Sequence, residues 1–234
     1  MNNNTFLEAI SDSFKCFLDS GTSRSTKKLN PLHGAIAKDI AERLGNNYEV
    51  LSQGWGEDRE ATIGGRYVDK KVDITIQHKG KNVGGIAVKF VMQNYSQNSN
   101  NYFENMLGET ANIRSNMIPY FQIFIILDRL PYYDKSKNIK RWEEFTDHNA
   151  EKYTVLSQDS IETFLHTPNK TLIYVIHIPD NDNLKTSDEY MDYYRDLEFS
   201  MQLSTHRYDC FGESVILNDY DEFIKKVYHT IMSL

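Results

Sequence analysis

Two apolar runs, at residues 121–127 and 172–178, most constrain the fold of this chain. Each has the length of a strand and lacks the alternation of a half-solvated sheet, which indicates a strand buried on both faces. Such strands need helices on both sides of the sheet. Both runs are too short to span a bilayer, and no apolar stretch follows the first residues. We therefore expect a cytoplasmic protein without a membrane partner.

Hydrophobic periodicity predicts helices and strands in alternation along the rest of the chain. The first half is expected to contain helices at 5–18, 32–44 and 102–117, strands at 48–51, 66–77 and 83–92, and polar loops at 20–30 and 93–101. The second half adds strands at 153–156 and 172–178 and helices at 159–166, 188–203 and 220–234. This succession is typical of an α/β protein.

Charge is divided unevenly between the two halves. The chain of 234 residues has a formal net charge of -7, which argues against a polycation that coats nucleic acid. Residues 1–141 hold 19 Lys/Arg and 15 Asp/Glu, whereas residues 142–234 hold 7 and 18. A polyanion is therefore expected to meet the first half. The two cysteines and the seven histidines show no spacing typical of a metal site.

Asp73 and Lys89 are the strongest candidates for chemistry. Each lies mid-strand, on the polar side of an alternating apolar pattern, and a turn at 79–82 joins the two strands into a hairpin. An ionisable group among apolar neighbours is costly unless it is paired. The ordinary interpretation is an Asp–Lys ion pair on a solvated sheet face, and the alternative is a functional site.

The segment Val72-Asp73-Ile74, a turn, and Gly85-Ile86-Ala87-Val88-Lys89-Phe90 together resemble the core of the PD-(D/E)XK nuclease superfamily. The family's order of helix, three strands, helix and strand is similar to that predicted over 32–127, about half the chain. The resemblance extends to type II restriction endonucleases, through the basic segment that follows Pro131-Tyr132-Tyr133-Asp134. It implies a restriction-endonuclease-like α/β core, a mixed central sheet flanked by helices, with additional C-terminal α/β elements.

The resemblance also implies a single nuclease domain over 1–234, with a catalytic core at about 32–128. The acidic part at about 142–234 would complete that core or serve dimerisation or specificity. The implied activity is sequence-specific, Mg²⁺-dependent hydrolysis of double-stranded DNA by a homodimer. The alternatives are a repair or recombination nuclease of the same superfamily, and a DNA-binding pseudo-nuclease that does not cut.

The resemblance assigns functional roles to only a few positions of this chain. Asp73 corresponds to the first metal-binding carboxylate, Lys89 to the lysine that acts on water and phosphate, and the backbone carbonyl of Val88 to a further metal ligand. Phosphodiester hydrolysis needs such a set, because a hard cation activates water and neutralises developing charge. Hard cations prefer oxygen ligands, and a fixed ammonium adds electrostatic stabilisation.

Ala87 departs from the family, which has Glu or Asp, sometimes Gln, at this position, and alanine cannot bind a metal. Three interpretations stay open. The chain is an inactivated variant, or the carboxylate has moved to the following helix, or the protein is a natural pseudo-nuclease. Glu104 is the nearest carboxylate on that helix, with Glu109 behind it. Seven polar or basic residues are candidate DNA contacts on phosphates or base edges: Arg66, Lys70, Lys71, Gln93, Asn94, Ser96 and Asn98.

Overall fold

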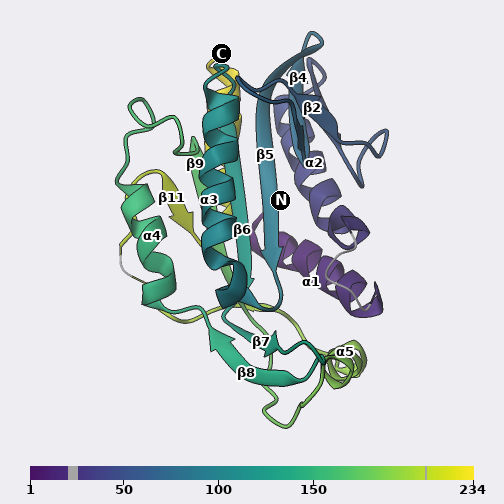
Figure 1. Ribbon diagram of the computed structural model, residues 1–234. Helices are drawn as coiled ribbons and strands as arrows, with labels where there is room; N and C mark the ends of the chain where they lie inside the picture. The colour runs from purple at the N-terminus through teal and green to yellow at the C-terminus, as the bar shows by residue number, and fades with distance from the viewer. Residues whose placement is uncertain (21–25, 209) are drawn as a thin grey trace.

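A mixed seven-stranded sheet forms the centre of the protein in a computed structural model that describes residues 1–20, 26–208 and 210–234 (Figure 1). Its strands run in the order β1 (Tyr48–Ser52), β4 (Ile74–His78), β5 (Lys81–Val91), β6 (Tyr120–Leu127), β9 (Lys170–His177) and β10 (Gln202–Leu203), and β11 (Val215–Leu217) also pairs with β9. β1, β4 and β5 are antiparallel, whereas β5, β6 and β9 are parallel. All eight residues of β6 are buried, as the first apolar run predicts.

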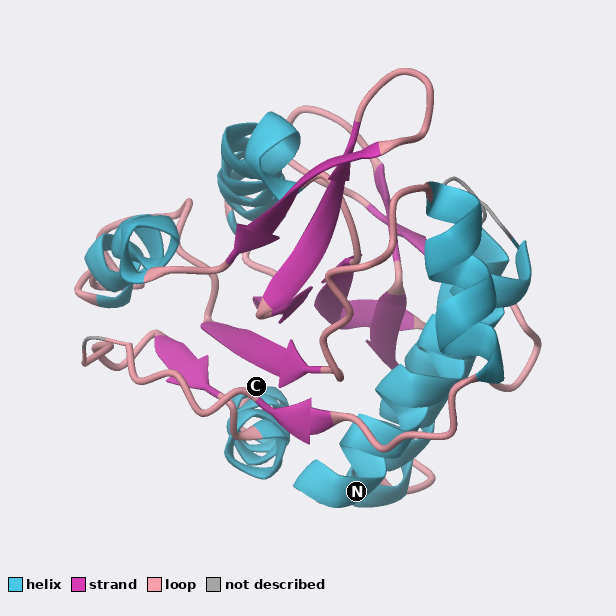
Figure 2. Ribbon diagram, turned by 90° about the horizontal axis from the view of Figure 1, so that it is seen from below, coloured by secondary structure: helices cyan, strands magenta, loops and turns pink. Residues whose placement is uncertain are grey.

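Helices cover both faces of this sheet, which confirms the expected α/β class (Figure 2). α3 packs against β6 on the face towards the viewer in Figure 1, and α6 packs against β9 on the opposite face. α2 packs against β1 and α1. The helices are α1 (Asn3–Ser20), α2 (Asn30–Leu44), α3 (Tyr95–Arg114), α4 (Asp147–Ser157), α5 (Ser187–Asp196) and α6 (Tyr220–Met232), with a 3₁₀ turn η1 at Thr26–Leu29.

Two short antiparallel ribbons lie outside the main sheet. β2 (Ala61–Ile63) pairs with β3 (Lys70–Val72), and β7 (Arg129–Tyr133) pairs with β8 (Ile139–Glu144). The strand expected over 66–77 is thus divided at Asp73, because β3 pairs with β2 while β4 pairs with β1 and β5. The division places Asp73 between two different sheets.

The predicted loop at 93–101 is wrong, because α3 begins at Tyr95 after an N-cap at Asn94 with a left-handed φ of 52°. The predicted strand at 153–156 is also wrong. Its buried residues, Tyr153 and Leu156, are three positions apart on one face of α4, which is helical spacing. The predicted helix at 159–166 consists of turns, and the helix expected over 188–203 ends at Asp196. Of the predicted loop at 20–30, residues 21–25 lie outside the described residues.

A common hydrophobic core connects the two halves of the chain. It includes Phe6 of α1, Ile36 of α2 and Ile123 of β6, together with Tyr174 of β9 and Phe223 of α6. The acidic part from residue 142 therefore contributes strands to the same sheet and side chains to the same core. Within the described ranges, no helix combines the length and the apolar character needed to cross a membrane.

Candidate functional site

Asp73 lies where β4 and β5 separate. Ile74 and Ile86 form the last pair of the antiparallel ladder at this end, so the next residues of β5 face no ladder partner on the β4 side. The backbone N–H of Val88 donates to Asp73 Oδ2 over 2.7 Å. Ser52 Oγ, at the end of β1, donates to the backbone carbonyl of Asp73 over 2.8 Å. The carboxylate and the backbone of Asp73 are therefore both held in place.

Val88 takes part through its N–H in this structure, whereas the resemblance implies a role for its carbonyl. The N–H and C=O of one strand residue face the same neighbouring strand. Since the N–H of Val88 points to Asp73, its carbonyl faces the same side. Both groups thus border the opening between β4 and β5.

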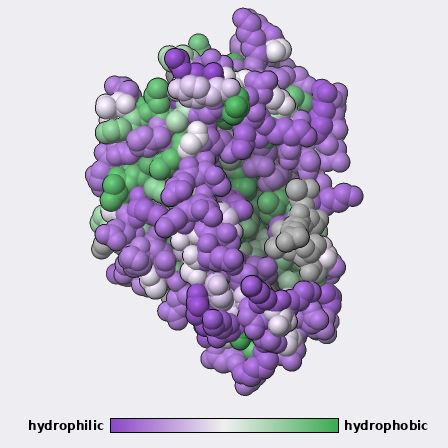
Figure 3. Space-filling view, viewed as in Figure 1, coloured by the Kyte–Doolittle hydropathy of each residue, from purple (hydrophilic) through white to green (hydrophobic). Residues whose placement is uncertain are grey.

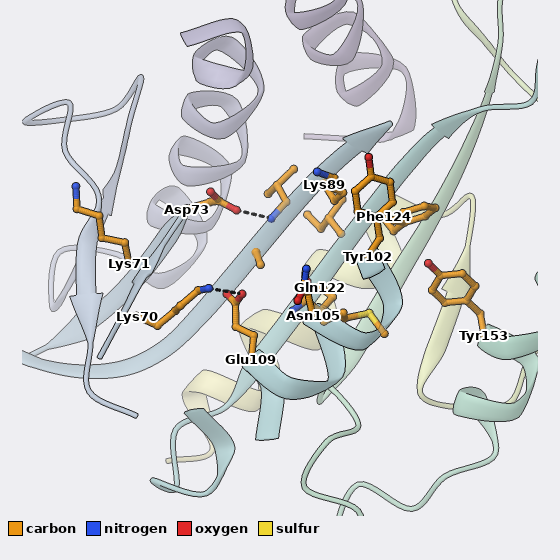
Figure 4. Close-up of a pocket in the computed structure, with 14 residues that line it drawn as sticks. Lys70, Lys71, Asp73, Lys89, Tyr102, Asn105, Glu109, Gln122, Phe124 and Tyr153 are labelled. Carbon is orange, nitrogen blue, oxygen red and sulfur yellow. Dashed lines mark hydrogen bonds and ion pairs between the residues drawn. The ribbon is translucent and has the colours of Figure 1, made fainter. Parts of the chain in front are cut away.

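A pocket of about 250 Å³ brings Asp73, Ala87 and Lys89 together (Figure 4). It lies between α3 and the strands β5 and β6, and Glu109 of α3 is also part of its wall. On the face shown in Figure 3, hydrophilic residues dominate and a hydrophobic area lies where β5 runs beside α3. Side chains that the sequence places on two strands thus share one concave surface with a carboxylate from a helix.

Asp73 and Lys89 do not form the ion pair of the ordinary interpretation, as far as the described part of the chain shows. Lys89 is exposed, and its Nζ lies 4.3 Å from the centre of the Tyr102 ring. Partial desolvation lowers the pKa of the Lys89 ammonium, and the negative charge of Asp73 opposes that shift. The ammonium therefore faces the pocket without a carboxylate bonded to it.

Burial raises the pKa of Asp73 from 3.8 to about 6. The hydrogen bond from Val88 opposes this shift, whereas the negative charge of Glu109 adds to it. Lys89 and Lys70 each lower this pKa to a smaller extent. A carboxylate that is costly to ionise beside another carboxylate is a position where a cation is favourable.

The helix carboxylate in the pocket is Glu109, whereas Glu104, the metal ligand predicted on this helix, is not part of the pocket wall. Glu104 is exposed and lies outside the pocket wall. Glu109 accepts a hydrogen bond from the hydroxyl of Tyr120 and forms an ion pair of 3.1 Å with Lys70. The two glutamates are five positions apart, so at 100° per residue they point to different sides of α3.

His33 and Glu60 are functional candidates that sequence reasoning missed. One ligand atom each from His33, Glu60 and Asp73 lie within 4.8 Å of one another. His33 is only 4% exposed, and neither ring nitrogen has a hydrogen-bond partner among the residues that the structure describes. Burial lowers the pKa of His33 to about 4, against the opposing charge of Glu60. The three residues are far apart in the sequence, so their spacing carries no metal signal.

Gln122 is a second residue that the sequence analysis passed over. It lies on β6 directly opposite Ala87 in the parallel ladder, is buried, and forms part of the pocket wall. The available signal is its position as the polar member of an otherwise apolar run. A polar side chain therefore lies beside Ala87, the position at which the resemblance implies a carboxylate.

The predicted DNA contacts divide into two groups, of which the first is exposed. Arg66, Lys70 and Lys71 lie on or just before β3, at the surface, and the two lysines are part of the pocket wall. Lys70 is engaged with Glu109. The positive charge that the sequence predicts near the hairpin is therefore at the mouth of the pocket.

The second group does not form an exposed recognition loop. Asn94 Oδ1 accepts the backbone N–H of Tyr133, and Ser96 is hydrogen-bonded to Glu143 and Arg141. These bonds attach the start of α3 to the β7–β8 ribbon. Of the other two residues, Gln93 is half-buried and Asn98 is hydrogen-bonded to Tyr102.

We expect Asp73 and His33 to affect stability in opposite directions between pH 4 and pH 6 in metal-free buffer. Folding raises the pKa of Asp73 from 3.8 to about 6, so its ionisation removes up to about 3 kcal/mol of stability as the pH rises. Folding lowers the pKa of His33 from 6.5 to about 4, so its protonation removes up to about 3 kcal/mol as the pH falls. The two contributions nearly cancel in the unaltered chain.

Urea unfolding at several pH values in EDTA tests this opposition. Relative to the unaltered chain, His33→Leu should become more stable as the pH falls from 6 to 4, since only the Asp73 contribution is left. Asp73→Asn should become less stable over the same range. Parallel profiles for all three proteins would contradict the assignment.

Comparisons with protein-family models, with curated proteins and with solved structures give no match for this chain. The class of the protein therefore follows from its fold and its pocket alone. It is an α/β protein with a mixed central sheet, and carboxylates, an ammonium group and a buried imidazole meet where two of its strands separate.

Proposed function

We propose that the protein is a metal-dependent DNA endonuclease that hydrolyses phosphodiester bonds. One observation supports the proposal most: Asp73 and Lys89 open onto one pocket together with Glu109, where β4 and β5 separate. We further propose the finer assignment from the sequence, a type II restriction endonuclease that acts on double-stranded DNA as a homodimer with a divalent cation such as Mg²⁺.

The residues of the pocket suit a divalent cation. Asp73 and Glu109 are close enough for the charge of Glu109 to raise the pKa of Asp73, and a cation between them would remove this repulsion. When bound, the cation would lower the pKa of a water molecule and neutralise charge on the phosphate. Carboxylates supplemented by water are the ligands that Mg²⁺ accepts.

The remaining groups of the pocket have complementary roles. Lys89 presents an ammonium that can stabilise negative charge on the scissile phosphate. Lys71 is exposed on the pocket wall and Arg66 is exposed before the start of β3, and both can contact phosphates of the DNA. The acidic second half of the chain supplies β9, β10 and β11, so its charge does not have to meet the DNA for the pocket to act.

Ala87→Glu is the substitution that tests the proposal most directly. It adds a carboxylate to the pocket wall beside Asp73 and opposite Gln122. We expect it to increase cleavage of supercoiled plasmid in Mg²⁺ or Mn²⁺ by at least about 100-fold, since a further ligand holds the cation. Ala41→Glu, on α2 and half-buried like Ala87 but outside the pocket wall, is the matched control and should leave cleavage unchanged.

The products of the plasmid assay distinguish the possible activities. Discrete fragments indicate a restriction enzyme, whereas a ladder or shortened ends indicate a repair or recombination nuclease. If the unaltered chain cleaves DNA and Glu109→Gln does not, Glu109 is the second metal-binding carboxylate. If both the unaltered chain and Ala87→Glu bind DNA but leave it intact in either metal, the enzyme proposal is wrong.

A further inference from the structure

We infer that His33, Glu60 and Asp73 form a binding site for a first-row transition-metal ion, and that this site takes Mn²⁺ in preference to Mg²⁺. Their ligand atoms lie within 4.8 Å of one another, a separation that one ion can bridge. The three residues come from α2, from the segment before β2 and from the junction of β3 and β4. The three ligands are therefore far apart in the sequence and close together in the fold.

The environment of the His33 side chain is the first observation that supports a metal site. The side chain is more than nine-tenths buried, and within residues 1–20, 26–208 and 210–234 both ring nitrogens lack a hydrogen-bond partner. A buried polar group without a partner costs free energy, so its presence calls for a specific reason. Coordination of a metal by one nitrogen would remove that cost at one of the two atoms, and the neighbouring carboxylates supply the charge that such an ion needs.

The backbone positions Glu60 and Asp73 side by side. Ala61 of β2 is paired with Val72 of β3. Glu60 precedes Ala61 and Asp73 follows Val72, so in an antiparallel ribbon these two residues are opposite each other at the next position. Two carboxylates at one end of a ribbon are therefore a result of the strand register.

A close contact between two glycines brings this ribbon end to His33. A Cβ atom on Gly34 would lie 2.2 Å from the carbonyl oxygen of Gly54, and a Cβ atom on Gly54 would lie 2.1 Å from that of Asn30. Gly54 also has a φ of +76°, in the left-handed region. The first turn of α2 can thus approach the segment that leads to Glu60 only because both positions lack a side chain.

The donor set determines which ion is preferred. Mg²⁺ is bound by oxygen ligands and keeps several waters, whereas an imidazole suits first-row transition ions. One imidazole and two carboxylates leave coordination positions open, as in catalytic rather than structural metal sites. The part this ion plays in hydrolysis rests on the proposed function, whereas its binding can be measured without any substrate.

The inference is tested by calorimetric titration of the metal-free protein with MnCl₂ and, separately, with MgCl₂. We expect Mn²⁺ to bind at least about 10-fold more tightly than Mg²⁺. His33→Leu should weaken Mn²⁺ binding at least about 10-fold and leave Mg²⁺ binding nearly unchanged. Pulsed electron paramagnetic resonance of bound Mn²⁺ should show coupling to an imidazole nitrogen in the unaltered chain, and this coupling should be absent from His33→Leu.

His148→Leu is the matched control, because His148 is exposed on α4 away from the site. If His33→Leu does not fold, Glu60→Gln takes its place, with Glu57→Gln as its control. Unchanged Mn²⁺ binding in a folded His33 or Glu60 variant would overturn the inference, as would the absence of nitrogen coupling. Mn²⁺ binding that depends on His33, with DNA left intact by both the unaltered chain and Ala87→Glu, would keep the site and refute the proposed function. DNA cleavage by either protein, with Mn²⁺ binding unchanged in His33→Leu, would support the proposed function and overturn the site.

Discussion

Asp73→Asn is expected to abolish metal binding and DNA cleavage together while the protein stays folded. Asp73 belongs both to the pocket that contains Lys89 and to the cluster that contains His33, so its loss removes a ligand from either set. We expect cleavage to fall at least about 1000-fold in whichever protein cleaves, the unaltered chain or Ala87→Glu. Stability at pH 7 in metal-free buffer should be maintained or raised, because a costly buried charge is removed.

Asp69→Asn provides the control for this prediction, since Asp69 is exposed four residues earlier. It should bind metal and cleave DNA like its parent. Calorimetric titration, plasmid cleavage and urea unfolding together separate the possible outcomes. If Asp73→Asn unfolds the protein, Asp73 is a structural residue, and if cleavage persists, the assigned metal ligand is wrong.

Gly34→Ala is expected to destabilise the protein by about 2 kcal/mol and to weaken Mn²⁺ binding. The new methyl group would meet the backbone of Gly54, which cannot rotate away as a side chain could. Overpacking of this kind costs about 3 kcal/mol, whereas alanine in a helix gains about 1 kcal/mol over glycine. The strain would move the segment that carries Glu60 away from His33, so we expect at least about a 10-fold loss of Mn²⁺ affinity.

The same substitution at Gly108 should have the opposite effect on stability. Gly108 is also in a helix, α3, but a Cβ atom there would meet nothing within 4 Å. Gly108→Ala should therefore stabilise the protein by about 1 kcal/mol and leave metal binding unchanged. Urea unfolding and Mn²⁺ titration of both variants measure the difference, and equal effects at the two positions would refute the role given to the glycine contact.

The sequence predicts the sheet and its central helices well where apolar periodicity is strong. The bounds of α2, β5, β6 and β9 follow their apolar patterns closely. Asp73 and Lys89 line one pocket, to which the predicted hairpin of β4 and β5 contributes, because hairpin geometry follows from local alternation and a short turn. These features depend on neighbouring residues, which is why the sequence shows them.

Features that depend on distant contacts could not be predicted in this way. The first turns of α3 have polar side chains without an apolar stripe, and they are ordered by bonds from Asn94 and Ser96 to the β7–β8 ribbon. The close approach of α2 to the segment before Glu60 depends on the contact between Gly34 and Gly54, which neither residue reveals alone. Whether Glu104 or Glu109 lies in the pocket depends on how α3 is rotated against the sheet.

The β2–β3 ribbon gives the protein a way to couple anion and cation binding. Lys70 and Lys71 lie on β3, and the same short ribbon ends at Glu60 and Asp73. A phosphate bound by Lys70 and Lys71 would therefore contact the same ribbon that positions Glu60 and Asp73, the proposed metal ligands. If the protein binds DNA and an ion as we propose, thermodynamic linkage makes the effect reciprocal: DNA would change the affinity for the ion by the same factor as the ion changes the affinity for DNA. The β2–β3 ribbon would then connect substrate binding to the occupancy of the proposed metal site.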